Sequence, residues 1–266
     1  GKALKTLEMK LTSKEFKPVL ELLADVGTKL VAWQNDLAHR KIHSEKDFKT
    51  EADRQAHEML SRGLSRLFPG VPVISEEDIS HDDERPEEYW LIDPIDGTAS
   101  WYNGFDGFVS QAALIVHGRP IFGVIHSPRM KSTWSAEEGG GAFLNDVLLP
   151  LLTSHDRIKF ADNTPCAHGI TKRLMDSLNT RDYLECGSMG LKAVLVADGT
   201  VDAFVKDVVV RDWDLAPVDV ILTEVGGSIC LLNGEKYLYS GSYEKENGFI
   251  VARDESLMMK VVSLQI

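Results

Sequence analysis

Hydrophobic residues recur at helical spacing in the first part of the chain. Between Phe16 and Val31 they return every three or four positions, which predicts an amphipathic helix over residues 14–34. A second such helix follows Thr50, a favourable N-cap residue, and ends at the pair Pro69-Gly70. Each helix has one apolar face for packing against the rest of the protein.

Strand patterns and turn signals replace this spacing after the second helix. The predicted strands of the first half are residues 71–75, 89–92, 109–116, 121–126 and 133–135. The second half has predicted helices at 169–179, 189–198, 213–225 and 254–262, and strands at 201–206, 227–232 and 248–252. The pattern predicts a mixed α/β fold in two parts, an N-terminal α+β half over residues 1–150 and a C-terminal α/β half over residues 151–266.

Composition places the chain among ordinary globular proteins. It has 266 residues, of which 43% are hydrophobic and 26% are charged. No run of about 18 apolar residues occurs, and the charged stretch from Lys2 to Lys10 contains no apolar signal core, so we expect no membrane association. The three cysteines, Cys166, Cys186 and Cys230, form no CxxC pair, which argues against a zinc site or disulfide framework and favours a cytoplasmic location.

The net charge of −12 bears on the binding partner. Such a charge repels nucleic acid, and the sequence has no basic stripe interleaved with aromatic residues. An acidic protein can still bind an anionic substrate when divalent cations reverse the local field. The lysine and glutamate residues around positions 45–54 are interpreted as solvated surface charge.

Acidic residues gather beside turn-forming residues in three clusters, at 75–78, 93–98 and 212–214. The middle cluster follows an apolar strand, which delivers Asp93 to the carboxyl end of that strand, where α/β sheets bind ligands. Pro94 then fixes the backbone, so the Ile95 carbonyl and both carboxylates of the cluster can converge on one point. Hard cations such as Mg²⁺ require oxygen ligands in this arrangement.

The two residues that complete the middle cluster indicate a phosphate site. A helix that begins near Thr98 would direct its free backbone N–H groups toward the same point, and Gly97 removes the side chain that would block an oxyanion. Metal-binding carboxylates beside such N–H donors are the arrangement that phosphoryl transfer uses. The pattern therefore favours a metal-dependent reaction at a phosphate ester.

Each cluster also has a purely structural interpretation. The stretch 93–98 forms a good β-turn, residues 76–78 are typical of a solvated loop, and Asp214 is a suitable cap for the helix that follows. Asp53 stands three residues after Thr50, as the acidic partner in a capping box does. The presence of all three clusters in one chain favours the functional interpretation.

Four stretches resemble the signatures of a known family, and these are residues 48–53, 73–77, 90–98 and 213–217. The family is the inositol monophosphatase superfamily, which includes inositol monophosphatases, 3′(2′),5′-bisphosphate nucleotidases, histidinol phosphatases and fructose-1,6-bisphosphatases. The order and spacing of the motifs fit from about Phe48 to Gly227. The resemblance implies a layered α-β-α-β-α sandwich, a homodimer, inhibition by Li⁺, and two or three Mg²⁺ ions as cofactors, with Mn²⁺ as a substitute.

The resemblance also implies roles for individual residues. The metal ligands are Glu76, Asp93 and the Ile95 carbonyl for the first ion, and Asp93, Asp96 and Asp214 for the second. The first glutamate of the pair is the usual ligand, so Glu76 is preferred to Glu77. Asp53 and Thr98, together with Glu76, match the residues that orient or deprotonate the attacking water, which reaches phosphorus in line without a covalent phosphoenzyme.

Substrate-binding residues follow from the same resemblance. Gly97 and Thr98 match phosphate contacts, Gly187-Ser188 begins the segment that contacts the ring hydroxyls of the substrate, and Asp214 lies on the leaving-group side. Counting back seven positions from Asp214 gives Asp207 as the hydroxyl-binding acid. Counting forward from residues 201–203 gives Lys206 instead.

The substrate is a small phosphorylated metabolite, and an inositol-monophosphate-type ester is predicted first. Residues 68–77 and 139–143 are closer to the bisphosphate nucleotidase branch, so 3′-phosphoadenosine 5′-phosphate is the alternative, and histidinol phosphate is the third. A different class of protein, a non-catalytic module that binds metal or phosphate, would show the loss of a ligand. Here all four carboxylates and Thr98 are present, which favours an enzyme.

Overall fold

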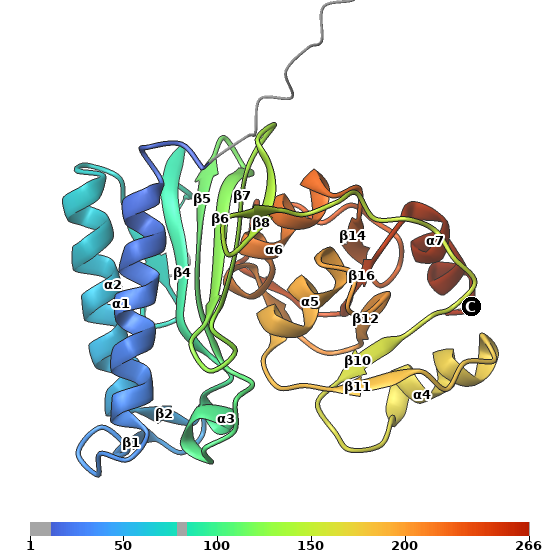
Figure 1. The fold of residues 1–266 in the computed structure, drawn as a ribbon, viewed down its shortest axis with the longest axis horizontal. Coiled ribbons are helices and arrows are strands. Elements are labelled where there is room, and N and C mark those ends of the chain that lie inside the picture. Colours follow the sequence, from blue (N-terminus) through green and yellow to red (C-terminus); the bar gives the residue numbers. More distant parts are fainter. Residues whose placement is uncertain (1–11, 79–83, 266) are drawn as a thin grey trace, which may run out of the picture.

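The computed structural model describes residues 12–78 and 84–265, which form five layers (Figure 1). One outer layer consists of α1 (Lys17–Trp33) and α2 (Glu51–Leu67), which cover a large sheet. Behind that sheet lie α5 (Met189–Ala197) and α6 (Asp212–Glu224), then a smaller sheet, and finally α4 (Gly169–Ser177) and α7 (Glu255–Ser263). The predicted α-β-α-β-α sandwich is confirmed. The predicted absence of a signal core concerns Lys2 to Lys10, which lie outside the described residues.

The first two helices form because of their caps and their apolar stripes. Pro18 lies in the first turn of α1, where its missing N–H has no consequence. Thr50 and Asp53 form a capping box at the start of α2, as the sequence predicted. The stripes bury eight fully inaccessible residues, Val19, Leu23, Val26 and Leu30 of α1 and Ala52, Ala56, Leu60 and Leu64 of α2. These pack against Trp90 and Phe122 of the sheet.

The strands of the large sheet follow one another in chain order. The structure describes β3 (Val73–Ser75), β4 (Glu88–Asp96), β5 (Val109–Val116), β6 (Arg119–Ser127), β7 (Ser132–Glu137), β8 (Gly141–Leu144) and β9 (Val147–Leu148). β3 runs parallel to β4, and the other neighbouring pairs are antiparallel. The carboxyl ends of β3 and β4 therefore meet at the same edge, which is where two of the acidic clusters begin.

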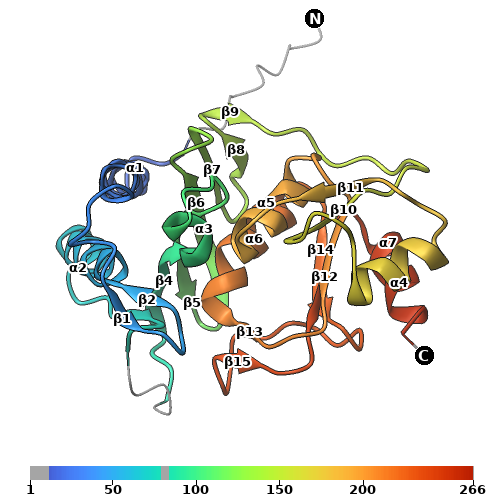
Figure 2. The same ribbon diagram turned by 90° about the horizontal axis from the view of Figure 1, so that it is seen from below.

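The smaller sheet has the strand order β11-β10-β12-β16-β14. Its strands are β10 (Phe160–Asp162), β11 (Tyr183–Glu185), β12 (Ala203–Lys206), β14 (Ser228–Leu231) and β16 (Phe249–Ala252). Figure 2 shows α5 and α6 between the two sheets. Because α6 packs on β6, one apolar core joins residues of both predicted halves, and the division near residue 150 stays a prediction.

Most predicted elements are present, and their ends differ from the predicted ones by no more than four residues. The strand predicted over 109–116 is β5 without change, and the helix predicted over 213–225 is α6, one residue earlier at each end. The strands that the sequence patterns missed include β8, β10 and β11, each three or four residues long. None of the described helices is long and apolar enough to span a membrane.

Candidate active site

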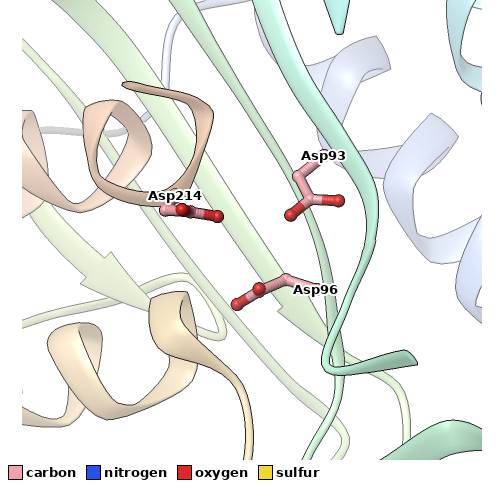
Figure 3. Close-up of side chains that lie close together, drawn as sticks. All are labelled: Asp93, Asp96 and Asp214. Atoms are coloured by element: carbon pink, nitrogen blue, oxygen red, sulfur yellow. The ribbon is translucent and has the colours of Figure 1, made fainter. Parts of the chain in front are cut away.

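A bulge at the end of β4 forms the centre of the site. Asp93 is paired with Gln111 and Asp96 with Val109, so three steps along β4 correspond to two along β5. Pro94 lies inside this irregularity, where its missing N–H leaves no gap in a regular ladder. The extra residue brings the carboxylates of Asp93 and Asp96 toward the same point, as Figure 3 shows.

The third carboxylate comes from the start of α6. One oxygen each of Asp93, Asp96 and Asp214 lies within 4.8 Å of the others. Asp214 accepts a hydrogen bond from the backbone N–H of Arg211 at 3.0 Å, so it also caps the helix, as its structural interpretation predicted. The three side chains are buried, with exposed fractions of 3%, 8% and 8%.

This concentration of buried negative charge fits a divalent cation. Burial and the repulsion from Asp96 raise the pKa of Asp93 well above its usual range, and the same two causes raise the pKa of Asp214 to about 8. The Oδ1 atom of Asp93 is buried and has no hydrogen-bond partner among the described residues. A hard cation would satisfy that oxygen and relieve the repulsion, so the residues present fit Mg²⁺.

Glu76 stands directly after β3 and lies beside this triad but outside it. Its negative charge contributes to the raised pKa of Asp93, behind burial and Asp96. Its Oε2 atom accepts a hydrogen bond from Lys49 Nζ at 2.8 Å. Lys49 also lies 3.5 Å from a carboxylate oxygen of Glu77. Both glutamates of the pair are therefore near the site, and Glu76 makes the shorter contact.

Lys49 is a candidate site residue that the sequence interpretation missed. Its side chain is only 16% exposed, so the interpretation of positions 45–54 as solvated charge is wrong for this residue. Burial alone would lower the pKa of Lys49, but the negative charges of Asp93, Glu76 and Asp53 outweigh it, so the pKa is raised and the ammonium stays charged. It lies on β2 (Lys49–Thr50), which pairs with β1 (Ile42–Ser44) just before α2.

Asp53 and Thr98 lie together on the same side of the site. The Thr98 hydroxyl donates to Asp53 Oδ1 at 3.0 Å, and the other carboxylate oxygen accepts from the Thr50 backbone and hydroxyl. Thr98 begins α3 (Thr98–Tyr102), so a helix does start where the phosphate-binding interpretation requires one. Gly97 has a φ of 90°, and a Cβ there would lie 2.8 Å from the Gly107 carbonyl oxygen, which excludes a side chain.

The predicted substrate loop is hydrogen-bonded directly to the acidic centre, a name used here for the triad together with the carboxylates beside it, namely Asp93, Asp96, Asp214, Glu76, Glu77 and Asp53. The Ser188 hydroxyl donates to Asp96 Oδ2, and the Gly190 N–H donates to the same oxygen at 2.7 Å. Gln111, which the sequence did not single out, donates to the carbonyls of Trp213 and Asp214 and so fixes the start of α6. A Cβ on Gly190 would lie 2.0 Å from Gln111 Oε1, so this close packing requires glycine.

A cavity of about 1210 Å³ opens from Asp96 and Gly97 toward the second half. Gly187 and Ser188 line it, and so do Lys192 and Lys206. Asp207 is not among the lining residues. Its carboxylate is 48% exposed and lies 3.7 Å from the Arg173 guanidinium, so the structure does not bring it to the other predicted residues. Of the two alternatives from the sequence, Lys206 is the one that faces the cavity.

Each of the two lysines of the cavity donates a hydrogen bond to another residue of the protein. Lys206 Nζ donates to Asp162, and Lys192 Nζ donates to the Cys186 carbonyl at 3.2 Å. Burial lowers the pKa of Lys192, while the nearby charge of Asp96 acts in the opposite direction. Burial also raises the pKa of the Cys186 thiol, which disfavours the thiolate that a nucleophile needs.

The layered sandwich, with buried carboxylates at the end of β4 and the start of α6, is typical of the phosphatases that use metal ions. The chain belongs to the inositol monophosphatase family, whose family model matches residues 16–265. It is similar to the 3′(2′),5′-bisphosphate nucleotidase CysQ of Aggregatibacter actinomycetemcomitans, with 30% identity over 239 residues, which are 86% of this chain and 89% of that protein.

Two further comparisons agree with this membership. The fructose-1,6-bisphosphatase/inositol-1-monophosphatase of Thermotoga maritima is 32% identical over 248 residues, which are 92% of this chain and 94% of that protein. The solved structure of a Thermotoga maritima IMPase matches with a TM-score of 0.76 at 28% identity, over 92% of this chain and 95% of that one. The names of these three proteins share phosphatase activity and differ in substrate.

Proposed function

We propose that this phosphatase is a Mg²⁺-dependent phosphomonoesterase whose substrate carries a second anionic group, as 3′-phosphoadenosine 5′-phosphate does. The observation that carries the proposal is the pair of lysines, Lys192 and Lys206, in the cavity that opens from Asp96. An anionic group of the substrate would find two ammonium groups there, in a protein with a net charge of −12.

The acidic centre would hold the metal ions. We assign Glu76, Asp93 and the Ile95 carbonyl to one ion, and Asp93, Asp96 and Asp214 to another. When bound, Mg²⁺ neutralises the charge of the phosphoryl group and lowers the pKa of water. The family membership and the orphaned buried oxygen of Asp93 support this assignment.

Asp53 and Thr98 would orient the attacking water. Because the Thr98 hydroxyl donates its proton to Asp53, its oxygen lone pairs remain free to accept a hydrogen bond from water. A water held in this way presents its own lone pair to phosphorus. Asp53 would then receive the proton, since burial raises the pKa of this carboxyl even though Lys49 acts in the opposite direction.

The shape and lining of the cavity favour a substrate larger than a phosphorylated polyol. Apolar side chains, among them Leu184, Met189 and Val208, line it together with the two lysines. A flat heterocyclic base can pack on such side chains while a distant phosphate reaches a lysine. A lysine ammonium has three donors, so Lys192 retains donors for a ligand after its bond to the Cys186 carbonyl.

The inositol-monophosphate-type ester predicted first from the sequence becomes the second candidate. Glu185 lines the same cavity, as Ser188 does, and a carboxylate is a good acceptor for ring hydroxyls. This arrangement would serve a polyol without needing either lysine. The adenosine bisphosphate would use the two lysines and the inositol phosphate would use Glu185, so an activity assay can distinguish the two candidates.

The test is phosphate release from 3′-phosphoadenosine 5′-phosphate, inositol 1-phosphate, histidinol phosphate and fructose 1,6-bisphosphate. Each ester is assayed with Mg²⁺, with a chelator, and with the Asp93→Asn variant. We expect Mg²⁺-dependent release that Asp93→Asn abolishes, with the highest kcat/KM for the adenosine bisphosphate. A higher kcat/KM for inositol 1-phosphate would reverse the order of the two candidates. Release from none of the esters by a folded protein would refute the proposed function.

A further inference from the structure

The acidic centre contains a cation that belongs to the protein itself. Lys49 Nζ lies 2.8 Å from Glu76 Oε2, 3.5 Å from Glu77 Oε1 and 3.9 Å from Asp53 Oδ1. In the part of the chain that the structure describes, no other side chain forms an ion pair with these three carboxylates. The ammonium therefore neutralises the three carboxylates that lie beside the triad of Asp93, Asp96 and Asp214.

The backbone around Lys49 is fixed by regular secondary structure, and this determines where the side chain begins. Lys49 is paired with Ser44 across the β1–β2 hairpin, and the next residue, Thr50, caps α2. The side chain is 16% exposed, whereas paired lysines on the protein surface, such as Lys172, are 55% exposed. A lysine held with so little exposure loses side-chain freedom, which its three carboxylate contacts offset.

The position of the ammonium bears on the number of metal ions. The assignment above uses Asp93, Asp96 and Asp214 for one ion, and Glu76 with Asp93 for another. The remaining oxygens of Glu76, together with Glu77 and Asp53, would attract a further divalent ion if nothing else neutralised them. Lys49 already stands among these three carboxylates.

We propose that Lys49 is a built-in cation of this active site that takes the place of an additional divalent ion, so that the enzyme needs one Mg²⁺ fewer than its carboxylates would otherwise bind. This inference rests on the proposed metal-dependent function. Lys49 acts as a positioning residue: its charge keeps Glu76 and Asp53 in place, and Asp53 Oδ1 is the same oxygen that accepts the hydrogen bond from Thr98.

Removal of the charge should open that place to a metal ion. In Lys49→Met the side chain keeps a similar length but cannot neutralise the three carboxylates. We expect Lys49→Met to bind one more Mn²⁺ per chain than the wild type, as measured by calorimetric titration and by the loss of the free Mn²⁺ signal in electron paramagnetic resonance. Lys49→Arg keeps the positive charge and should retain the wild-type number.

The Mg²⁺ dependence of phosphate release gives a second readout. For Lys49→Met, the Mg²⁺ concentration for half-maximal rate should rise by about tenfold, because the added ion binds more weakly than a tethered ammonium. At saturating Mg²⁺ the rate should return toward that of the wild type. The matched control is Lys46→Met, which removes an exposed lysine of the same hairpin that has no ion pair among the described residues, and neither quantity should change.

Two outcomes would overturn the proposal. One is a Lys49→Met protein that binds the wild-type number of Mn²⁺ ions with unchanged Mg²⁺ dependence, which would leave Lys49 a structural role only. The other is a variant that reaches full rate at lower Mg²⁺, which would make Lys49 a competitor of the metal. Far-UV circular dichroism checks that the variant folds, and Lys49→Gln replaces it if it does not. The Mn²⁺ count needs no substrate, so it stays informative if every ester in the panel fails.

Discussion

The hydroxyl of Thr98 donates a hydrogen bond to Asp53 Oδ1 at 3.0 Å and joins the start of α3 to the start of α2. The other oxygen of the same carboxylate accepts from the backbone N–H and the hydroxyl of Thr50, at 2.8 Å and 2.7 Å. Asp53 is therefore the acid of a capping box and a member of the candidate site at once. The capping box fixes the Asp53 carboxylate, and its Oδ1 atom in turn fixes the Thr98 hydroxyl, which we propose orients the attacking water.

The role of the Thr98 hydroxyl can be tested separately from that of the rest of the side chain. Thr98→Ala removes the hydroxyl that we propose orients water, so kcat should fall on the order of 10²-fold with little change in Mg²⁺ binding. Thr98→Ser keeps the hydroxyl and should retain most of the rate. Steady-state kinetics on the best substrate of the panel measures both, and equal losses in the two variants would contradict the orienting role.

Asp93 should be destabilising without metal and stabilising with it. Its burial and the repulsion from Asp96 raise its pKa, so the ionised form weakens the folded metal-free protein. In the presence of a chelator, Asp93→Asn should raise the free energy of unfolding by about 1 kcal/mol. Saturating Mg²⁺ should raise the melting temperature of the wild type but not of the variant. Thermal melts with chelator and with Mg²⁺ test both statements, and a variant that Mg²⁺ still stabilises fully would contradict the assignment of Asp93.

Lys206 should affect substrates according to their charge. Lys206→Met removes an ammonium that lines the cavity, so KM for 3′-phosphoadenosine 5′-phosphate should rise by about tenfold or more. Inositol 1-phosphate has no second phosphate that could contact Lys206, so its KM should change much less. The variant leaves the buried Asp162 with hydrogen bonds from Thr171 and the Asn163 N–H, so the fold should persist, as a thermal melt can verify. An equal rise in KM for both substrates would argue against a second anion site.

A buried ion-pair network at the start of α6 should be important for stability. Asp212 is fully buried, and its carboxylate accepts hydrogen bonds from Arg85, Lys245 and Tyr237. Asp212→Asn leaves two cations beside a neutral amide, so it should lower the free energy of unfolding by about 3 kcal/mol. The matched control is Glu138→Gln, because Glu138 forms an exposed pair with Arg119 and should change stability by less than about 1 kcal/mol. Urea unfolding measures the difference, and similar losses in both variants would contradict the distinction.

The acidic centre could be predicted because its residues stand at the ends of elements that the sequence shows. Asp93 and Asp96 follow an apolar strand, and Asp214 opens an apolar helix, so local patterns alone place them at element ends. That these ends meet at one point follows from the fold, which the family resemblance supplied. The structure adds the bulge between Asp93 and Asp96, which no hydropathy pattern reports.

Lys49 and Lys206 were harder to interpret for a different reason. The environment of Lys49 depends on the β1–β2 hairpin lying beside the end of β3, a contact between residues 27 positions apart that the local sequence does not specify. The choice between Lys206 and Asp207 depends on a single position, because Lys206 is the last residue of β12 and Asp207 lies just beyond it. A slip of one residue in counting therefore exchanged a side chain that faces the cavity for one that faces solvent.

His126 should make the folded protein sensitive to acid. Its ring is buried beside Gly27 of α1, where a Cβ would lie 2.6 Å from the ring, and Nδ1 is 2.8 Å from the Thr133 hydroxyl. Burial lowers the pKa of His126 to about 4 from its ordinary value of 6.5. The unfolded chain therefore binds a proton first as the pH falls, so the contribution of His126 to stability is full above about pH 6.5 and declines as the pH falls toward about 4.

Between about pH 7 and about pH 4.5 the loss of stability from His126 should be about 2 kcal/mol. His126→Gln cannot take up the proton, so its free energy of unfolding should depend less on pH in this window. Urea unfolding of both proteins at the two pH values measures the difference, and parallel pH profiles would show that the charge of His126 plays no part.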